Sequence, residues 1–177
     1  MMHGRIRLLA SALAAVLTPA IALSAFVLPT QAQAAAPAPV VSVDHAKCQV
    51  HAVLASKEGN AGIPKELKFL ETQLKDDEFA AYKSFRLIEQ KALKLDRGKK
   101  TDVSFTSGNR LGLRLIGGDD KRLDLHADLS SRSGTKSLLA TDYSIEDAGV
   151  LMIRAGSYTH KDDTGRLFFA IQCVRSK

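Results

Sequence analysis

The feature that most constrains the fold of this chain is a run of alternating apolar and polar residues near its middle. From residue 123 to residue 129, leucine or alanine occupies every second position, with Asp124, His126 and Asp128 between them. Successive side chains of a β-strand point to opposite faces, so this run would bury one face and expose the other to solvent. The pattern predicts a strand of an antiparallel sheet that is solvated on one side.

Further segments with a period of two, or with short apolar runs, occupy most of the remaining chain and are separated by turns that contain glycine. The other expected strands lie at 48–56, 85–95, 103–105, 111–115, 138–144, 150–154 and 167–173. Seven or eight short strands with such turns are typical of an antiparallel β-sandwich or an open barrel. We therefore expect a mainly β protein.

One segment has a helical period instead. After Pro64, apolar residues that begin with Ile63 recur every three or four positions up to Leu74, among lysines and glutamates. This spacing predicts one amphipathic helix of about four turns after the first strand, with an extension through Phe79 and Tyr82 left open. Its apolar stripe could bind a membrane or a partner helix. We favour packing against the core, over one end of the sandwich.

The N-terminus has the three parts of a secretory signal peptide. Arg5 and Arg7 precede an apolar run at 8–28, and the small-residue triplet Ala32-Gln33-Ala34 follows. We assign 1–34 to the signal peptide, 35–43 to an Ala/Pro linker and 44–177 to a single globular domain. An uncleaved membrane anchor is the alternative, which Pro19 and the cleavage triplet disfavour. We expect a secreted or periplasmic protein with no stable membrane span after processing.

The two cysteines lie near the two ends of the expected domain. An exported protein with two cysteines can form one intramolecular disulfide, here between Cys48 and Cys173, and this bond would tie the first strand to the last. His45 and His51 flank Cys48 and suggest metal binding as the alternative. However, alternation along a strand places His51 on the face opposite Cys48. We expect the disulfide, with no metal and no cofactor.

Charge excludes one class of partner more clearly than it identifies another. The globular part holds 23 of the 25 bases and all 19 acids, so its net charge is +4. This excess is small, and no concentrated basic face with stacking aromatic residues is apparent, so nucleic acid is not expected. One stretch is nevertheless rich in bases: Lys83, Arg86, Lys91, Lys94, Arg97, Lys99 and Lys100. It could present a cationic stripe to an anionic envelope component, or simply contain the outward residues of strands.

Catalytic signals are weak. Ser133 and Lys136 have the S-x-x-K spacing but lack the motifs that accompany it in serine hydrolases, and no metalloprotease, nucleotide-binding or nucleophile-elbow motif occurs. A hydrolase site could be formed by Ser157, His160 and Asp162 or Asp163, although such groups usually converge from different elements. His126 could act as an acid–base group or metal ligand. Its expected position on a solvated strand face favours an ordinary surface residue.

Antiparallel topology sorts the loops into two ends. Loops 96–101, 117–120 and 145–148 should share one end. There the carboxylates of Asp119, Asp120, Glu146 and Asp147 could hold Ca²⁺ or, as we favour, pair with nearby bases.

Loops 107–109, 130–137 and 156–165 should share the other end. Their hydroxyl, aromatic and cationic side chains are typical of polar recognition. The candidate binding residues are Arg132, Tyr158 and His160 at this end and Arg97, Lys99 and Lys100 at the other.

Three phrases give the domain a family resemblance: Tyr82-Lys83-Ser84-Phe85-Arg86-Leu87, Gly149-Val150-Leu151-Met152-Ile153 and Gly165-Arg166-Leu167-Phe168-Phe169-Ala170-Ile171. In its layout, most of 46–174 resembles uncharacterised small secreted β-rich proteins of predatory and soil-dwelling bacteria such as myxobacteria. The resemblance implies an envelope or secreted location in a bacterium. Its phrases are strands and turns, so it implies no catalytic residue.

Three functions follow as hypotheses. The leading one is a noncatalytic exported module that binds a protein or an anionic envelope component. A secreted inhibitor of a hydrolase is the alternative, and a small hydrolase with the Ser157, His160 and Asp162 site is the third. The sequence leaves the ligand, the presence of any enzymatic activity and the oligomeric state open.

Overall fold

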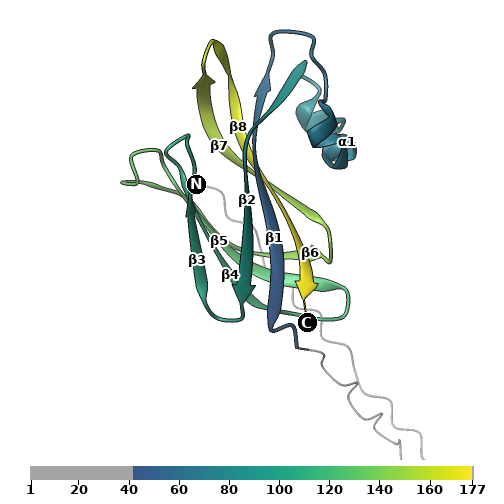
Figure 1. Cartoon of the computed structure of the whole chain (residues 1–177), viewed down its shortest axis with the longest axis vertical. Helices are drawn as coiled ribbons and strands as arrows, with labels where there is room; N and C mark the ends of the chain where they lie inside the picture. Colours follow the sequence, from purple (N-terminus) through teal and green to yellow (C-terminus); the bar gives the residue numbers. More distant parts are fainter. Residues whose placement is uncertain (1–41, 177) are drawn as a thin grey trace, which may run out of the picture. The chain divides into compact units, whose positions relative to one another are not determined.

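The computed structural model describes residues 42–176 (Figure 1). The expected signal peptide at 1–34 and most of the expected linker at 35–43 lie outside these residues. Within 42–176, no helix is both long and apolar enough to cross a bilayer.

Eight antiparallel strands form two four-stranded sheets. The strands are β1 (His45–Ser56), β2 (Ser84–Asp96), β3 (Lys100–Ser104), β4 (Arg110–Gly118), β5 (Arg122–Ser130), β6 (Ser137–Glu146), β7 (Val150–His160) and β8 (Asp163–Ser176). The first sheet has the order β2-β1-β8-β7, and the second has the order β3-β4-β5-β6. The mainly β, antiparallel fold expected from the period of two is confirmed, and of the two expected architectures the two sheets fit a sandwich.

The disulfide between Cys48 and Cys173 is also confirmed. The two cysteines are direct partners in the β1–β8 ladder, with their Cα atoms 4.0 Å apart. Both are buried in the core between the sheets. The first and last strands are thus neighbours in the centre of the first sheet, and the bond closes a sequence separation of 125 residues. Cys48 is therefore not free to ligate a metal.

The core between the sheets follows the alternation in the sequence. Every apolar residue of the run at 123–129 is fully buried on β5, while its polar neighbours remain partly exposed. Leu111, Leu113 and Leu115 do the same on β4, and Phe105 packs against Phe169 of the first sheet with 4.5 Å between ring centroids. One face of the second sheet is therefore buried, as expected.

The expected four-turn helix is wrong in length and type. The structure has a 3₁₀ helix, η1 (Lys65–Leu70), a single α-helical turn, α1 (Glu71–Leu74), and a separate 3₁₀ turn, η2 (Asp77–Phe79). The apolar stripe would next require an apolar residue at 77 or 78, where the chain has an aspartate and a glutamate. The helix ends at this point because its buried stripe ends.

This helical segment covers the outer face of the first sheet instead of an end of the sandwich (Figure 1). Leu67, Leu70 and Leu74 pack on Val53 and Phe168 in a second apolar cluster, separate from the core between the sheets. The distal half of β1 is consequently buried on both faces, whereas its first half alternates between exposed and buried residues.

A second correction concerns the expected loop at 156–165. Most of it is a hairpin: β7 continues to His160, β8 begins at Asp163, and only two residues form the turn. The glycines that suggested a loop serve other purposes. Gly156 adjoins a register shift in the β7–β8 ladder, and Gly165 lets β8 approach β1, since a Cβ there would lie 2.3 Å from the Ala55 carbonyl oxygen.

Candidate functional site

The six candidate binding residues divide between the two ends of the sandwich, as the antiparallel topology predicts. Arg97, Lys99 and Lys100 lie at or beside the β2–β3 turn, at the end where β1 starts and β8 finishes. Arg132 lies in the β5–β6 loop at the opposite end. Tyr158 and His160 lie near the tip of the β7–β8 hairpin, on a strand and not in the long loop that the sequence suggested.

The β5–β6 loop at 131–136 holds Arg132 through its own hydrogen bonds. The Ser131 amide donates to the Lys136 carbonyl at 2.7 Å, and the Gly134 amide donates to the Ser131 carbonyl at 2.8 Å. The β3–β4 turn packs closely against this loop at Gly108. A side chain at that position would crowd the loop, since its Cβ would lie 3.1 Å from the Arg132 carbonyl oxygen. These contacts fix the backbone from which the Arg132 side chain extends.

The Arg132 side chain reaches across from the second sheet to the first. Its guanidinium donates to the Ser157 carbonyl, and its Cζ lies 4.8 Å from the centroid of the Tyr158 ring. The Tyr158 and His160 rings are 6.3 Å apart. A guanidinium over an aromatic face is a favourable cation–π arrangement. The structure thus brings Arg132, Tyr158 and His160 together, and we call these three residues the tip cluster.

The surroundings of the tip cluster carry charges of both signs, since Asp162 lies in the hairpin turn and Asp163, the ladder partner of His160, pairs with Arg86. Lys136 and Lys161 are exposed in the neighbouring turns, and Arg166 donates to the Ser157 hydroxyl at 2.6 Å. Among the described residues, no carboxylate forms an ion pair with Arg132, because the guanidinium uses a backbone carbonyl and an aromatic ring as its partners. Its positive charge therefore remains available to an anionic group.

The geometry does not provide the hydrolase site considered from the sequence. Strand alternation places Ser157 and His160 on opposite faces of β7, because their spacing of three is odd and the pairing with β8 is regular there. The Ser157 hydroxyl accepts its hydrogen bond from Arg166. The hydroxyl and the imidazole therefore do not form a nucleophile–base pair.

The three candidate cations at the opposite end are all paired with carboxylates. Arg97 lies 3.5 Å from Asp44, and Lys99 lies 3.2 Å from Asp96. Lys100 lies 3.1 Å from Asp128. The hydrogen bond from Lys99 lowers the pKa of Asp96, with a smaller contribution from His45. These pairs are solvent-exposed and contribute little to stability, but they neutralise the cationic stripe at this end.

The acidic loops at the same end are connected by Arg175, which the sequence reasoning did not single out. Its backbone amide and its Nε donate to the two carboxylate oxygens of Asp147, at 2.8 and 3.0 Å, and its Nη1 donates to the Asp119 carbonyl. The backbone amide of Arg175 is the main cause of the lowered pKa of Asp147. The Asp119 carboxylate accepts from the amides of Lys121 and Arg122.

Of the four loop carboxylates, Asp147 forms an ion pair, with Arg175 and not with the bases that we expected, while Asp119 accepts from backbone amides. Within 42–176, no group of three or more potential ligand side chains is arranged to hold a metal ion. A hollow of about 640 Å³ lies beside Arg175. Its charged lining side chains, Asp44, His45, Asp147 and Arg175, are all already paired.

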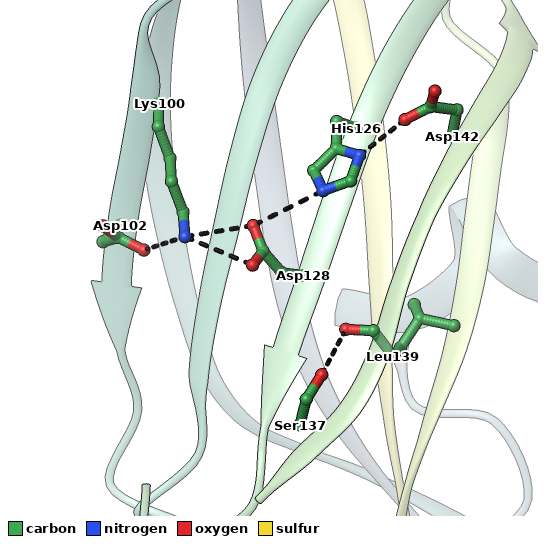
Figure 2. A network of polar contacts seen from close by, with 7 residues as sticks. All are labelled: Lys100, Asp102, His126, Asp128, Ser137, Leu139 and Asp142. Atoms are coloured by element: carbon green, nitrogen blue, oxygen red, sulfur yellow. Dashed lines mark hydrogen bonds and ion pairs between the residues drawn. The ribbon is translucent and has the colours of Figure 1, made fainter.

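A polar network crosses the outer face of the second sheet (Figure 2). His126 Nδ1 lies 2.5 Å from Asp142 on β6, while His126 Nε2 lies 3.9 Å from Asp128. Asp128 contacts Lys100 of β3, whose ammonium also lies 3.5 Å from Asp102. The hydrogen bond to Asp128 is the main cause of the raised pKa of Lys100.

Gly112 makes this network possible. It lies on β4 between Asp102 of β3 and Asp128 of β5, and a Cβ there would lie 2.3 Å from Cε of Lys100. The absent side chain allows Lys100 to reach over β4 to its partner on β5. A glycine inside a strand can mark such a close approach, but the sequence does not reveal which residue approaches.

The network gives His126 two carboxylate neighbours. The imidazole is bound between two carboxylates, and the hydroxyl of Ser137 in the same view donates to the Leu139 carbonyl (Figure 2). All five charged or titratable residues of the network are at least 25% exposed on a sheet surface. This is the solvated strand face that the alternation predicts.

The tip cluster is therefore the arrangement that differs from ordinary surface pairing. It joins the two sheets and combines a guanidinium without a carboxylate partner, an aromatic ring and an imidazole. Comparisons of the chain with protein-family models, with curated proteins and with solved structures give no match, so its function must be argued from this geometry.

Proposed function

We propose that this protein is a noncatalytic exported module that binds an anionic polymer of the bacterial envelope through the tip cluster, Arg132, Tyr158 and His160. The observation that carries the proposal is the position of Arg132. Its guanidinium lies over Tyr158 and extends from a loop with two internal backbone hydrogen bonds, and no carboxylate within residues 42–176 forms an ion pair with it. A preorganised cation beside an aromatic ring and an imidazole suits recognition of an anionic group on a hydroxyl-rich polymer.

The location forms part of the same proposal. The signal peptide assigned to 1–34 would export the chain, with cleavage after Ala34, and place the domain in the periplasm or outside the cell. The Cys48–Cys173 disulfide is consistent with an oxidising, extracellular compartment. An envelope component is the anionic partner that a protein meets there.

The test compares two variants that each remove one positive charge. The probe is soluble polygalacturonate, titrated against the full chain, with neutral dextran as the control polymer. Arg132→Gln should weaken binding by about tenfold, because a charge-assisted contact is lost. Lys99→Gln is the matched control at the other end, and it should change the affinity by less than about twofold, because that ammonium is already paired.

Equal affinities of the two variants would assign the binding to net charge and contradict a role for the tip cluster. Tyr158→Leu gives a second measurement, since it removes the ring under Arg132 without changing any charge. It should weaken binding by about fivefold through loss of the cation–π contact and of the positioning of Arg132.

The loop at 131–136 also supports a second candidate function, a secreted inhibitor of a hydrolase. Its internal hydrogen bonds and its close approach to Gly108 favour a defined loop conformation, and a preorganised projecting loop suits insertion into an active site. Inhibition assays against lysozymes and proteases would separate the two functions. Inhibition that is lost in Arg132→Gln, without polygalacturonate binding by the wild type, would favour the inhibitor.

A further inference from the structure

The two sheets leave four edge strands, and three of them carry features that discourage pairing with another chain. β2 has Lys91 and Lys94 and a register shift in its ladder with β1. β3 is only five residues long. β7 has a register shift between Arg154 and Gly156. Short edges, lysines and bulges are the usual means by which proteins protect exposed sheet edges.

β6 lacks most of these features. It is ten residues long, from Ser137 to Glu146, and contains no lysine, arginine, proline or glycine. The irregularity in its ladder with β5 is a register shift at Leu138, so the strand is regular from Leu139 onward. Within residues 42–176, no strand pairs with its other edge. Unlike the other three edges, β6 is an open template for a further strand.

The hydrogen-bonding pattern between β5 and β6 shows which backbone amides of β6 point toward its open edge. The Asp147 amide donates to the Lys121 carbonyl at 2.8 Å, which makes this residue pair a hydrogen-bonded one. Hydrogen-bonded and non-hydrogen-bonded pairs alternate along an antiparallel ladder. The amides of Ala140, Asp142 and Ser144 therefore point away from β5, toward the open edge.

The side chains of β6 restrict the chemistry of an added strand. On the inner face Leu139, Tyr143 and Ile145 are only half-buried against the core, so apolar side chains from a neighbouring strand would cover them. On the outer face the charged residues of β6 are both acidic: Glu146, and Asp142, which contacts His126 but is still 69% exposed. An added strand that alternates apolar and basic residues would match both faces.

We propose that β6 is the docking edge for an extended polypeptide strand in which apolar and basic residues alternate. The strand would extend the second sheet to five strands by β-augmentation, with backbone hydrogen bonds to β6 and its basic side chains beside Asp142 and Glu146. This surface is separate from the tip cluster and does not depend on the function proposed for it.

The probe is an end-blocked peptide of about nine alternating lysine and valine residues, long enough to pair along β6. Titrated against the full chain, it should bind, and a peptide with glutamate in place of lysine should not. Ala140→Pro removes one edge amide without touching the ladder to β5 and should weaken binding by about tenfold. Ala140→Val retains the amide and should bind like the wild type.

Amide hydrogen exchange of the wild type gives a measurement that needs no variant. The lysine–valine peptide should slow exchange at Ala140, Asp142 and Ser144 by about tenfold, while amides of β3 keep their rates. Arg132→Gln should bind the peptide as the wild type does, which separates this proposal from the proposed function.

Three outcomes would overturn the proposal: no binding of the peptide, equal binding by Ala140→Pro, or protection at another edge. Sedimentation of the full chain tests whether a second copy of the chain occupies the β6 edge instead. If the wild type is a dimer that Ala140→Pro converts to a monomer, the edge is filled by a second copy of the chain, and the proposal of a basic partner strand is wrong.

Discussion

The first sheet is covered on both faces along part of its length, whereas the second sheet packs through one face only. The first sheet also contains the disulfide and supports the helical segment, while the second exposes the polar network and the open edge of β6. The first sheet therefore contributes more to stability, and the second presents more of the polar surface. Substitutions that disturb the first sheet should cost several kcal/mol, and those on the outer face of the second should cost little.

The largest effect is expected from the disulfide. Replacing both Cys48 and Cys173 with alanine should lower the free energy of unfolding by about 3–5 kcal/mol, since the bond closes a long loop in the unfolded chain. Guanidinium unfolding of the wild type and the double variant measures the difference. A loss below about 1 kcal/mol would show that the β1–β8 ladder holds without the bond.

The second-largest loss of stability is expected in the apolar cluster between the helical segment and the first sheet. Leu70 is fully buried there, and Leu70→Ala should destabilise the protein by about 2–4 kcal/mol through lost burial and a cavity. Leu138→Ala is the matched control on the second sheet. Leu138 is 40% exposed, so its truncation should stay within about 0.5 kcal/mol. Similar costs at the two positions would contradict the asymmetry between the sheets.

Substitution of one glycine in each sheet, Gly165 in the first and Gly112 in the second, allows a direct comparison of their stability costs. An added Cβ would lie 2.3 Å from the Ala55 carbonyl oxygen at Gly165 and 2.3 Å from the Lys100 side chain at Gly112. The backbone of Ala55 is fixed in the sheet, whereas the end of the Lys100 side chain can move to another rotamer. Gly165→Ala should therefore cost about 1–3 kcal/mol, and Gly112→Ala less than about 1 kcal/mol. Thermal unfolding measures both, and the reverse order would show that the polar network matters more than the strand contact.

The smallest effect is a pH dependence in the first sheet. His51 is 6% exposed beneath Phe69, with its ring centroid 4.5 Å away and its Nδ1 without a hydrogen-bond partner among the described residues. Burial is the main cause that lowers the pKa of His51 below its ordinary value of 6.5. The folded state therefore disfavours the protonated ring, while the unfolded chain protonates near the ordinary value.

Stability should fall as the pH decreases below about 6.5, until the lowered pKa of the folded state is reached. The carboxylates with lowered pKa, such as Asp147, lose their contribution only at more acidic pH. Urea unfolding at about pH 7.5 and about pH 5.5 should show a decrease for the wild type that His51→Leu reduces. Parallel profiles for the two proteins would rule out His51 as its cause.

The second sheet was the more predictable one, because a single covered face leaves a clean alternation in the sequence. The burial of Leu123 and Leu125 follows directly from that pattern. On β1 the pattern disappears beyond Val50, since the helical segment covers the second face. The length of that helix depends on which residues find an apolar surface to cover, and periodicity alone does not report this.

For the candidate site, strand topology predicted the end of the sandwich at which each residue lies, but not the contacts that it makes. Alternation of the loops between two ends correctly separated Arg132 from Arg97, and the count of two cysteines in a chain expected to be exported indicated the disulfide. The partners of these cations depend on strand register, which the sequence does not specify. Hence neither the contact of Arg132 with Tyr158 nor the role of Arg175 could be derived in advance.

The position of the disulfide also determines how the domain carries mechanical load. Cys48 lies three residues after the start of β1, and Cys173 lies three residues before the end of β8. A force that pulls residues 42 and 176 apart would pass through the covalent bond after a few residues have peeled away. The remaining strands would stay outside the line of tension, so stretching alone would not unfold the domain until the bond was reduced.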